Sequence, residues 1–276
     1  KVAKQEMFYK NDVFKPGLIL LRGAWCPFGV EFNFPCGHSV TTLSEVDSYL
    51  RKNSDGSGSI FVGDVEQVSR MKWLVEIRLF PREANFRTRI RLMNGTEVAR
   101  RYYFWSNAAV SATPELQFIS PATEAKPSWS KKAVPFPIIQ GVDKSWYKNH
   151  DHSVDLFTVN SSEDYFGYYD HGKQFGVVHV APWYKIRGKK FFTWGTGPDG
   201  LIWAKILSEK AGPYIEIQSG PFPTQSDFGM LQPHTSNVWE AMWYPVRKTG
   251  AFTYANEYAA LRIETSAAGK KMRRVK

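Results

Sequence analysis

The feature that most constrains this chain is the two-residue period of its apolar side chains. Segments with this alternation recur along the sequence, and turn-forming pairs such as Asn94 and Gly95 stand between them. Side chains that alternate in this way lie on opposite faces of a β-strand. The predicted strands cover 59–65, 72–80, 86–93, 99–105, 176–181 and 202–207. Many short strands joined by Gly and Pro turns favour a large antiparallel sandwich, so we predict an all-β fold.

Helical periodicity is weak, and the best candidate helices cover 42–52 and 257–262. At 276 residues the chain can bury a core as one large β domain or as two smaller ones. No repeat or linker divides it, so we predict a single domain over residues 1–276. The opening residues 1–6 resemble the middle of a domain rather than a leader, so we expect earlier strands before them. The sequence therefore leaves the compartment open, with the cytoplasm favoured on balance.

The net charge of +10 first suggests a polyanionic partner. The basic residues are spread along the chain, however, and the one dense run, 270–276, resembles a solvated tail. Arg87, Arg89 and Arg91 alternate on one predicted strand, with Arg78 on an earlier one, and form either a basic stripe or an ordinary solvent face. We favour the solvent face and predict no nucleic-acid partner. No apolar run reaches the roughly 20 residues that span a bilayer, so we predict no membrane segment.

Metal and cofactor signals are missing from the sequence. The two cysteines, Cys26 and Cys36, either pair across a hairpin in an oxidising compartment or remain reduced in a β core. No C-x-x-C, H-E-x-x-H or EF-hand spacing occurs, and no glycine-rich phosphate loop is present. We therefore predict neither a metal nor a cofactor.

The strand 213–218 carries the most informative polar residue. Alternation puts Tyr214, Glu216 and Gln218 on one face and Ile215 and Ile217 on the other. A carboxylate between an aromatic ring and an amide, on a strand with an apolar back, is typical of a face offered to a polar ligand. The alternative is an exposed glutamate on the solvent side of an edge strand.

Other candidate residues stand near turns. The polar ones are Arg22, Glu31, His38, Asn107, Lys148, Asp170, His171 and His179. A carboxylate can act as general base and a histidine can protonate an oxygen, each contributing roughly 10²–10⁴-fold when well placed. Loop aromatics such as Trp25 and Trp146 offer flat faces for stacking. Each residue also has a structural explanation, as a turn residue, an ion pair or a surface charge. Together these residue types suit a neutral sugar.

The order of three motifs resembles that of the aldose 1-epimerase (galactose mutarotase) family. These motifs are residues 214–218 with 225–233, residues 168–171, and residues 105–109. The resemblance implies a large antiparallel β-supersandwich in which Glu216 is the general base and Asp170 binds a sugar hydroxyl. The family's general-acid histidine would fall on Ala108, and its late Gly-Glu is replaced by residues 234–235. An acid must then come from elsewhere, with His38, His171, His179 or Glu31 as candidates.

A denser resemblance, over nearly the whole chain, is to a bacterial domain family of unknown activity that often precedes tetratricopeptide repeats. Its motifs match residues 29–35, 145–149, 166–171 and 243–246. The resemblance implies a longer protein with a helical repeat region as an intramolecular partner, and it implies no particular reaction.

We therefore predict a galactose mutarotase-like β-supersandwich, with some N-terminal strands missing, that binds a glycoside or oligosaccharide in an aromatic-lined cleft. The expected chemistry is glycoside hydrolase-type or epimerase-like, with Glu216 as base or nucleophile and His38, Glu31 or His171 as its catalytic partner. The expected substrate-binding residues are Arg22, Trp25, Asn107, Trp146, Lys148, Asp170, His179, Gln218 and Gln225. The alternative is a non-catalytic carbohydrate-binding or scaffold module, which the alanine at 108 supports.

Overall fold

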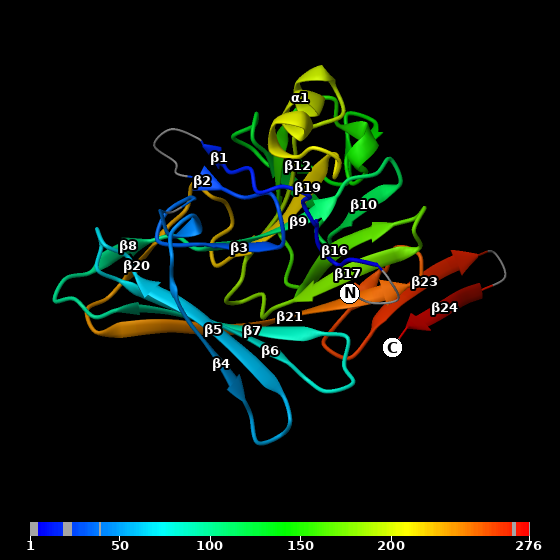
Figure 1. The fold of residues 1–276 in the computed structure, drawn as a ribbon. Coiled ribbons are helices and arrows are strands. Elements are labelled where there is room, and N and C mark those ends of the chain that lie inside the picture. The colour runs from blue at the N-terminus through cyan, green and yellow to red at the C-terminus, as the bar shows by residue number, and fades with distance from the viewer. Residues whose placement is uncertain (1–4, 19–23, 39, 267–268, 276) are drawn as a thin grey trace.

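The fold is built on two large antiparallel sheets that pack face to face (Figure 1). The computed structural model describes residues 5–18, 24–38, 40–266 and 269–275. In Figure 1 the seven-stranded sheet lies beneath α1, and the eight-stranded sheet curves from the right-hand side to the lower left. The predicted all-β supersandwich is confirmed.

The seven-stranded sheet has the strand order β12-β11-β15-β18-β19-β9-β3. These strands are β12 (Val134–Pro135), β11 (Glu124–Pro127), β15 (Val154–Val159), β18 (Gly188–Thr193), β19 (Tyr214–Gly220), β9 (Trp105–Ser111) and β3 (Val30–Asn33). The eight-stranded sheet comprises, in order, β10 (Leu116–Ile119), β16 (Tyr165–Asp170), β17 (Phe175–Val180), β21 (Thr235–Arg247), β7 (Phe86–Asn94), β6 (Lys72–Leu79), β5 (Gly58–Val65) and β4 (Asp47–Lys52).

Smaller elements surround the two sheets. The short strands are β1 (Gly17–Leu18) with β2 (Ala24–Trp25), β13 (Ile138–Ile139) with β14 (Val142–Asp143), β8 (Arg100–Tyr102) with β20 (Gly229–Leu231), and β22 (Tyr254–Ala255), β23 (Ala260–Ser266) and β24 (Gly269–Val275). The helical elements are α1 (Pro198–Leu207) and the 3₁₀ turns η2 (Val40–Thr42) and η3 (Tyr147–Asn149). Among the described residues, no helix is long and apolar enough to cross a bilayer.

The main core lies between the inward faces of the two sheets. Its buried members include Ala108, Phe118, Leu156, Phe166, Val177, Phe191, Ile215, Ile217 and Trp243. Burying a large apolar side chain of this kind stabilises the fold by about 1.5–3 kcal/mol. Because this layer takes up alternate residues of each strand, the remaining residues face outward.

The predicted division of β19 into two faces is confirmed. Ile215 and Ile217 are fully buried in the core. The strand lies between β18 and β9, and all seven of its residues are buried. The alternative of an exposed glutamate on an edge strand is therefore wrong.

Three secondary-structure predictions are wrong for identifiable reasons. The predicted strand 202–207 lies in α1, because Pro198 and Asp199 in the first turn favour the start of a helix there. Residues 47–52 of the predicted helix 42–52 form β4 instead. Pairing with β5 holds this segment as a strand although all of its residues are exposed. The predicted helix 257–262 overlaps β23, which pairs with β22 and β24. Cys26 and Cys36, whose pairing the sequence left open, are both free.

Candidate functional site

The outer face of the seven-stranded sheet carries a row of polar side chains. Strand register puts Glu31, Asn107, Gln218 and Lys190 opposite one another across β3, β9, β19 and β18. Glu216 lies two residues from Gln218 on the same face of β19. Since Ile215 and Ile217 fill the core, these polar groups all point away from it.

Glu216 is a buried carboxyl group with a perturbed acidity. Its residue is only 8% exposed, and Gln218 Nε2 donates a 2.6 Å hydrogen bond to its Oε2. Burial raises the pKa of Glu216 from 4.5 to about 7, against the positive charge of Lys190 and with help from the negative charge of Glu31. A carboxyl group with this pKa populates both protonation states near neutral pH, which is what proton transfer requires.

A chain of hydrogen bonds fixes the side chains beside Glu216. Gln225 Nε2 donates to Gln218 Oε1 at 2.8 Å, and Lys190 Nζ donates to Gln225 Oε1 at 2.6 Å. Lys190 is almost fully buried and also pairs with Asp155 Oδ1 at 2.5 Å. Because each amide is held at both ends, Gln218 presents its amide N–H to Glu216 in one fixed orientation.

Glu31 is surrounded by hydrogen-bond donors. His38 Nδ1 lies 3.0 Å from Oε1, and Thr42 Oγ1 donates to the same oxygen at 3.2 Å. Asn107 and Asn33 donate their amide N–H groups to Oε2 at 3.0 and 3.1 Å. Burial alone would lower the pKa of His38, but the hydrogen bond to Glu31 and its charge raise it above the ordinary value. Glu31 therefore favours the protonated form of His38.

Two amide oxygens next to Glu31 have no hydrogen-bond partner among the described residues. They are Asn33 Oδ1 and Asn107 Oδ1, on side chains that are 1% and 5% exposed. Buried acceptors of this kind are nearly always satisfied in folded proteins. A ligand hydroxyl or a water molecule on this face would satisfy them.

Indole rings stand beside the carboxylates. Trp25 lies 5.4 Å from the His38 ring and 6.2 Å from Trp194, which stacks on Trp203 of α1 at 4.4 Å. The Tyr214 hydroxyl accepts hydrogen bonds from the indole N–H groups of Trp25 and Trp194 at 3.1 and 3.2 Å. This arrangement gives the site a rigid aromatic wall.

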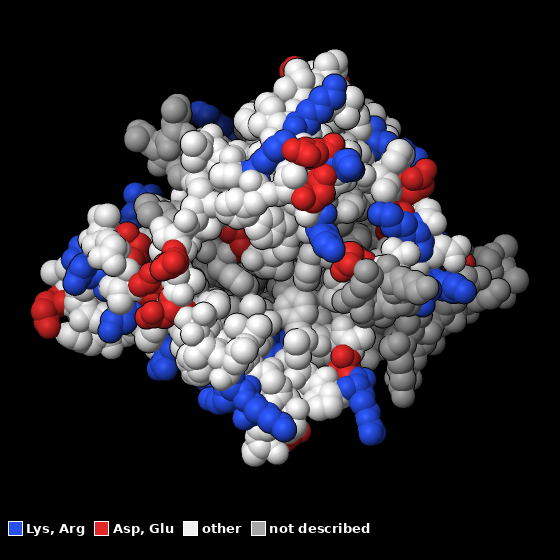
Figure 2. Space-filling model, viewed as in Figure 1, with Lys and Arg blue, Asp and Glu red and all other residues white. Residues whose placement is uncertain are grey.

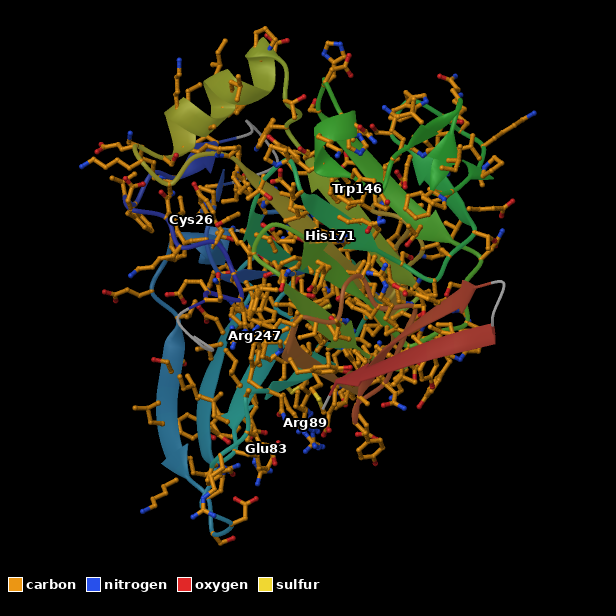
Figure 3. All side chains as sticks on the ribbon, turned by 90° about the vertical axis from the view of Figure 1, so that its right-hand side faces the viewer. Cys26, Glu83, Arg89, Trp146, His171 and Arg247 are labelled. Atoms are coloured by element: carbon orange, nitrogen blue, oxygen red, sulfur yellow. The ribbon has the colours of Figure 1, made fainter. Side chains whose placement is uncertain are left out.

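A second group of predicted residues lies elsewhere, on the outer face of the eight-stranded sheet. The Trp146 indole stacks on the His171 ring, with 4.9 Å between the ring centroids, and Lys148 Nζ lies 4.7 Å from the centroid of the Trp146 ring. Figure 3 shows Trp146 and His171 together and well away from Cys26, the neighbour of Trp25 in the sequence. Because its ring already contacts two side chains, Trp146 offers little surface for sugar stacking.

Asp170 ends β16 and is committed to local contacts. It accepts hydrogen bonds from Thr113 Oγ1 at 2.9 Å and from the Lys173 backbone N–H at 2.9 Å. Lys173 Nζ also lies 3.4 Å from Asp170. These contacts match the structural alternative for Asp170, a residue that starts a turn. Asp170 lies in the eight-stranded sheet, whereas Glu216 and its neighbours lie in the seven-stranded sheet.

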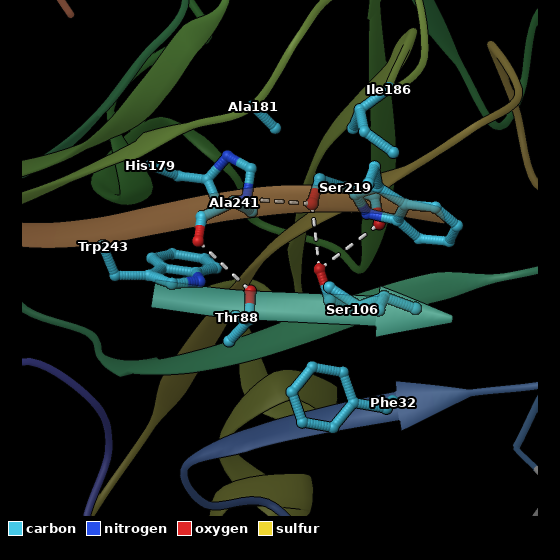
Figure 4. Close-up of a pocket in the computed structure, with 11 residues that line it drawn as sticks. Phe32, Thr88, Ser106, His179, Ala181, Ile186, Ser219, Ala241 and Trp243 are labelled. Carbon is cyan, nitrogen blue, oxygen red and sulfur yellow. Dashed lines mark hydrogen bonds between the residues drawn. The ribbon is translucent and has the colours of Figure 1, made fainter. Parts of the chain in front are cut away.

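His179 faces the interior between the two sheets. Its ring packs against Trp243 and Phe166. Figure 4 shows the ring beside Trp243 and Ser219, and the Ser219 Oγ lies 3.4 Å from Nε2. The adjoining cavity measures about 10 Å³, which is room for one water molecule at most. Burial lowers the pKa of His179 to about 3, so the ring is neutral at physiological pH and has no proton to spare as an acid.

Strand register shows that neither alanine of β9 next to Glu216 supplies a general acid. Ala108 faces the core, whereas Ala109 is the outward neighbour of Glu216 across β9 and β19. Of the three histidines that were candidates, only His38 is close enough for its charge to act on the pKa of Glu216. Arg22, the remaining predicted residue, lies outside the described part of the chain.

Lys190, Asn33 and Asp155 belong to the site but were not predicted. Asn33 alternates with Glu31 and could have been found from that spacing. Lys190 and its neighbour Lys189 precede Phe191 and Phe192 in β18, and nothing in this local pattern shows that Lys190 is buried and paired. Among the described residues, no group of three or more His, Cys, Asp or Glu side chains is placed to hold a metal ion.

The comparison with solved structures assigns the fold class. The chain is similar to a galactose mutarotase-like protein from Clostridium acetobutylicum, with a TM-score of 0.53 and 9% identity over 87% of this chain and 78% of that one. It is also similar to a galactose mutarotase related enzyme from Lactobacillus acidophilus, with a TM-score of 0.51 and 9% identity over 80% and 84% of the two chains. The protein is thus a supersandwich of the galactose mutarotase-like class, and identities this low establish the fold alone.

The family is shown by a longer match. Residues 1–246 match the family described as "Domain of unknown function (DUF5107)", and the chain belongs to this family. A TPR-domain containing protein from Parabacteroides distasonis has the same fold, with a TM-score of 0.79 and 25% identity. That match covers 88% of this chain but only 41% of the other, so the chain spans less than half the length of this relative.

Proposed function

We propose that this domain binds a sugar on the outer face of the seven-stranded sheet and transfers protons there between the sugar and the pair Glu216 and His38. The observation that carries the proposal is the buried Glu216 carboxyl group with a pKa of about 7. Acid–base groups are most effective when their pKa lies close to the working pH.

The two groups have complementary roles. Ionised Glu216 accepts a proton from a sugar hydroxyl, and protonated His38 donates a proton to a second sugar oxygen. At an anomeric centre this pair of transfers, from O1–H to Glu216 and from His38 to the ring oxygen, opens the ring; reversal after rotation closes it as the other anomer. Gln218 keeps the Glu216 carboxyl group oriented, and Glu31 favours the protonated form of His38.

The contacts of Glu31 favour this scheme over a mechanism with two carboxylates. Glu31 already receives hydrogen bonds at both of its oxygens from four side chains. A carboxyl group whose two oxygens already accept these hydrogen bonds has little capacity left to donate a proton to a ligand. The proposal therefore gives Glu31 the role of orienting His38.

Sugar chemistry fits the remaining groups on this face. The unpartnered oxygens of Asn33 and Asn107 would accept hydrogen bonds from hydroxyl groups. The half-buried Trp194, held in place by the buried Trp25, would pack against the apolar face of a pyranose ring. The galactose mutarotase-like relatives of this fold support the same substrate class. Ala108 stands where the aldose 1-epimerase motif has its general-acid histidine. This difference favours a second candidate function, a module that binds sugars without turnover.

A panel of free aldoses, glycosides and oligosaccharides tests the proposal, with anomeric exchange and reducing ends followed by NMR. We expect the wild type to accelerate anomeric exchange and Glu216→Gln to lose roughly 10²-fold or more of that rate. His171→Gln is the matched control, since it also removes a titrating group, and it should retain the wild-type rate. Binding without turnover, unchanged in Glu216→Gln, would overturn the catalytic role and leave a binding module.

A further inference from the structure

The outer face of the eight-stranded sheet has a groove that the proposed sugar site does not use. Its volume is about 100 Å³, several times the space that one water molecule needs. Residues of β6, β7 and β21 and the residue after β6 line it: Glu76, Arg78, Phe80, Arg87, Thr88, Arg89 and Glu240. Val75 and Ile90 point into the core from the same strands, so the groove lies on the far side of the sheet from it.

Two arginines in this groove are held together despite their equal charge. Arg78 and Arg87 are direct partners across β6 and β7, an arrangement that destabilises a sheet. Both guanidinium groups lie over the Phe80 ring, at 4.9 and 5.2 Å from its centroid. Cation–π contacts with one shared ring thus keep two positive charges beside the groove.

Two acidic residues near the groove, Asp55 and Glu76, already contact other side chains. Arg78 pairs with Asp55 at 2.5 Å. Glu76 accepts a 2.6 Å hydrogen bond from Ser59 Oγ and lies 3.5 Å from Arg51. Glu76 is also the direct cross-strand partner of Arg89, as Glu240 is on the other side, so the carboxylates of the groove flank Arg89, whereas the direct partners of Arg87 are Arg78 and Met242.

The charge of Arg87 is therefore the one in the groove without an acidic partner across the sheet. Arg89 and Glu240 are separated by 3.8 Å, which is a long ion pair between exposed side chains. Arg87 makes no ion pair with any residue in the described part of the chain, and its neighbour Phe80 supplies only a cation–π contact. Figure 3 shows Arg89 at the edge of the ribbon remote from Trp146, and Figure 2 shows basic and acidic side chains intermingled on the face it draws. The Arg87 guanidinium group is therefore available as a hydrogen-bond donor beside the groove.

We propose that the groove is a second binding site, which takes an oxyanion group such as phosphate, sulfate or carboxylate. Arg87 supplies two parallel N–H donors to the anion, and Arg89 supplies further donors from the next outward position of the same strand. The anion relieves the repulsion between Arg78 and Arg87, which explains why the sheet retains them as partners. The group arrives either as a free inorganic anion or as the charged substituent of an acidic saccharide.

Calorimetric titration at constant ionic strength, with sodium chloride as the reference salt, tests the site. The probes are inorganic phosphate, inorganic sulfate and glucuronic acid, so the two sources of the anion are separated by which probe saturates. We expect saturable binding of at least one probe, weakened about 10-fold or more in Arg87→Gln. Arg91→Gln is the matched control, because Arg91 is exposed on the same face of β7 but does not line the groove.

Three outcomes would overturn the proposal. They are no saturable binding above the sodium chloride reference, binding that Arg87→Gln leaves intact, and equal weakening in Arg91→Gln, which would indicate a general effect of net charge. Unfolding by urea gives a second readout: without ligand, the midpoint of Arg87→Gln should be equal to or above that of the wild type. A lower midpoint would assign Arg87 a structural role. Anion binding should survive Glu216→Gln, so failure of the sugar site and failure of this site are distinguishable.

Discussion

Glu216 should make a large contribution to the pH dependence of folding stability. Burial raises its pKa from 4.5 to about 7, so the folded protein prefers the protonated carboxyl group. The stability gained from this preference is fully present below about pH 4.5, the unfolded value, and is lost as the pH rises through about 7. A difference of this size corresponds to about 3 kcal/mol.

Glu216→Gln isolates this contribution. The amide oxygen still accepts the hydrogen bond from Gln218, but the side chain no longer titrates. Relative to the wild type, the variant should gain up to about 3 kcal/mol of unfolding free energy between about pH 4.5 and pH 8.5. Urea unfolding followed by tryptophan fluorescence at several pH values measures the difference.

The matched control for this experiment is Glu115→Gln, a change of the same kind at an exposed glutamate. Its difference from the wild type should stay constant across the pH range. If Glu216→Gln behaves in the same way, or if the wild type gains relative stability at high pH, then Glu216 is not a buried carboxyl group with a raised pKa. The proposed chemistry would lose its main support.

Three further predictions concern the same face. If turnover is found, its kcat/KM should follow a bell-shaped pH profile, rising as Glu216 loses its proton near pH 7 and falling as His38 loses its own, with His38→Gln removing the alkaline limb. Lys190→Met should move the acidic limb to higher pH, because the charge of Lys190 lowers the pKa of Glu216; an unmoved limb would exclude that interaction. Tyr214→Phe should cost about 2–4 kcal/mol in urea unfolding, since the indole N–H groups of Trp25 and Trp194 lose their shared acceptor, whereas Tyr254→Phe should cost almost nothing.

Strand alternation made the fold and part of the site predictable. Tyr214, Glu216 and Gln218 share a face because side chains on a strand alternate, and this local rule needs no knowledge of distant residues. The same rule connects Glu31 with Asn33. Where helix and strand patterns coincide, as in residues 202–207, the first-turn signals of α1 decided the outcome instead.

Residues far apart in the sequence could be assigned to a common site only from the tertiary structure. Trp146 and His171 have the residue types of a sugar site, yet they pack against each other on the other sheet. Lys190 has a residue type typical of surfaces, yet its pairing with Asp155, 35 positions earlier in the chain, buries it beside Glu216. Alternation predicts that two residues share a face of one strand, but it does not predict which sheet that strand joins.

The most direct test of the sugar site is to locate a bound sugar in a crystal soaked with the aldose that gives the fastest exchange or the tightest binding. The account predicts electron density for a sugar ring on the outer face of the seven-stranded sheet, with one oxygen in hydrogen-bond reach of Glu216 and another in reach of His38. A sugar seated instead at Trp146 and His171, or a Glu216 face that stays empty at saturating sugar, would contradict it.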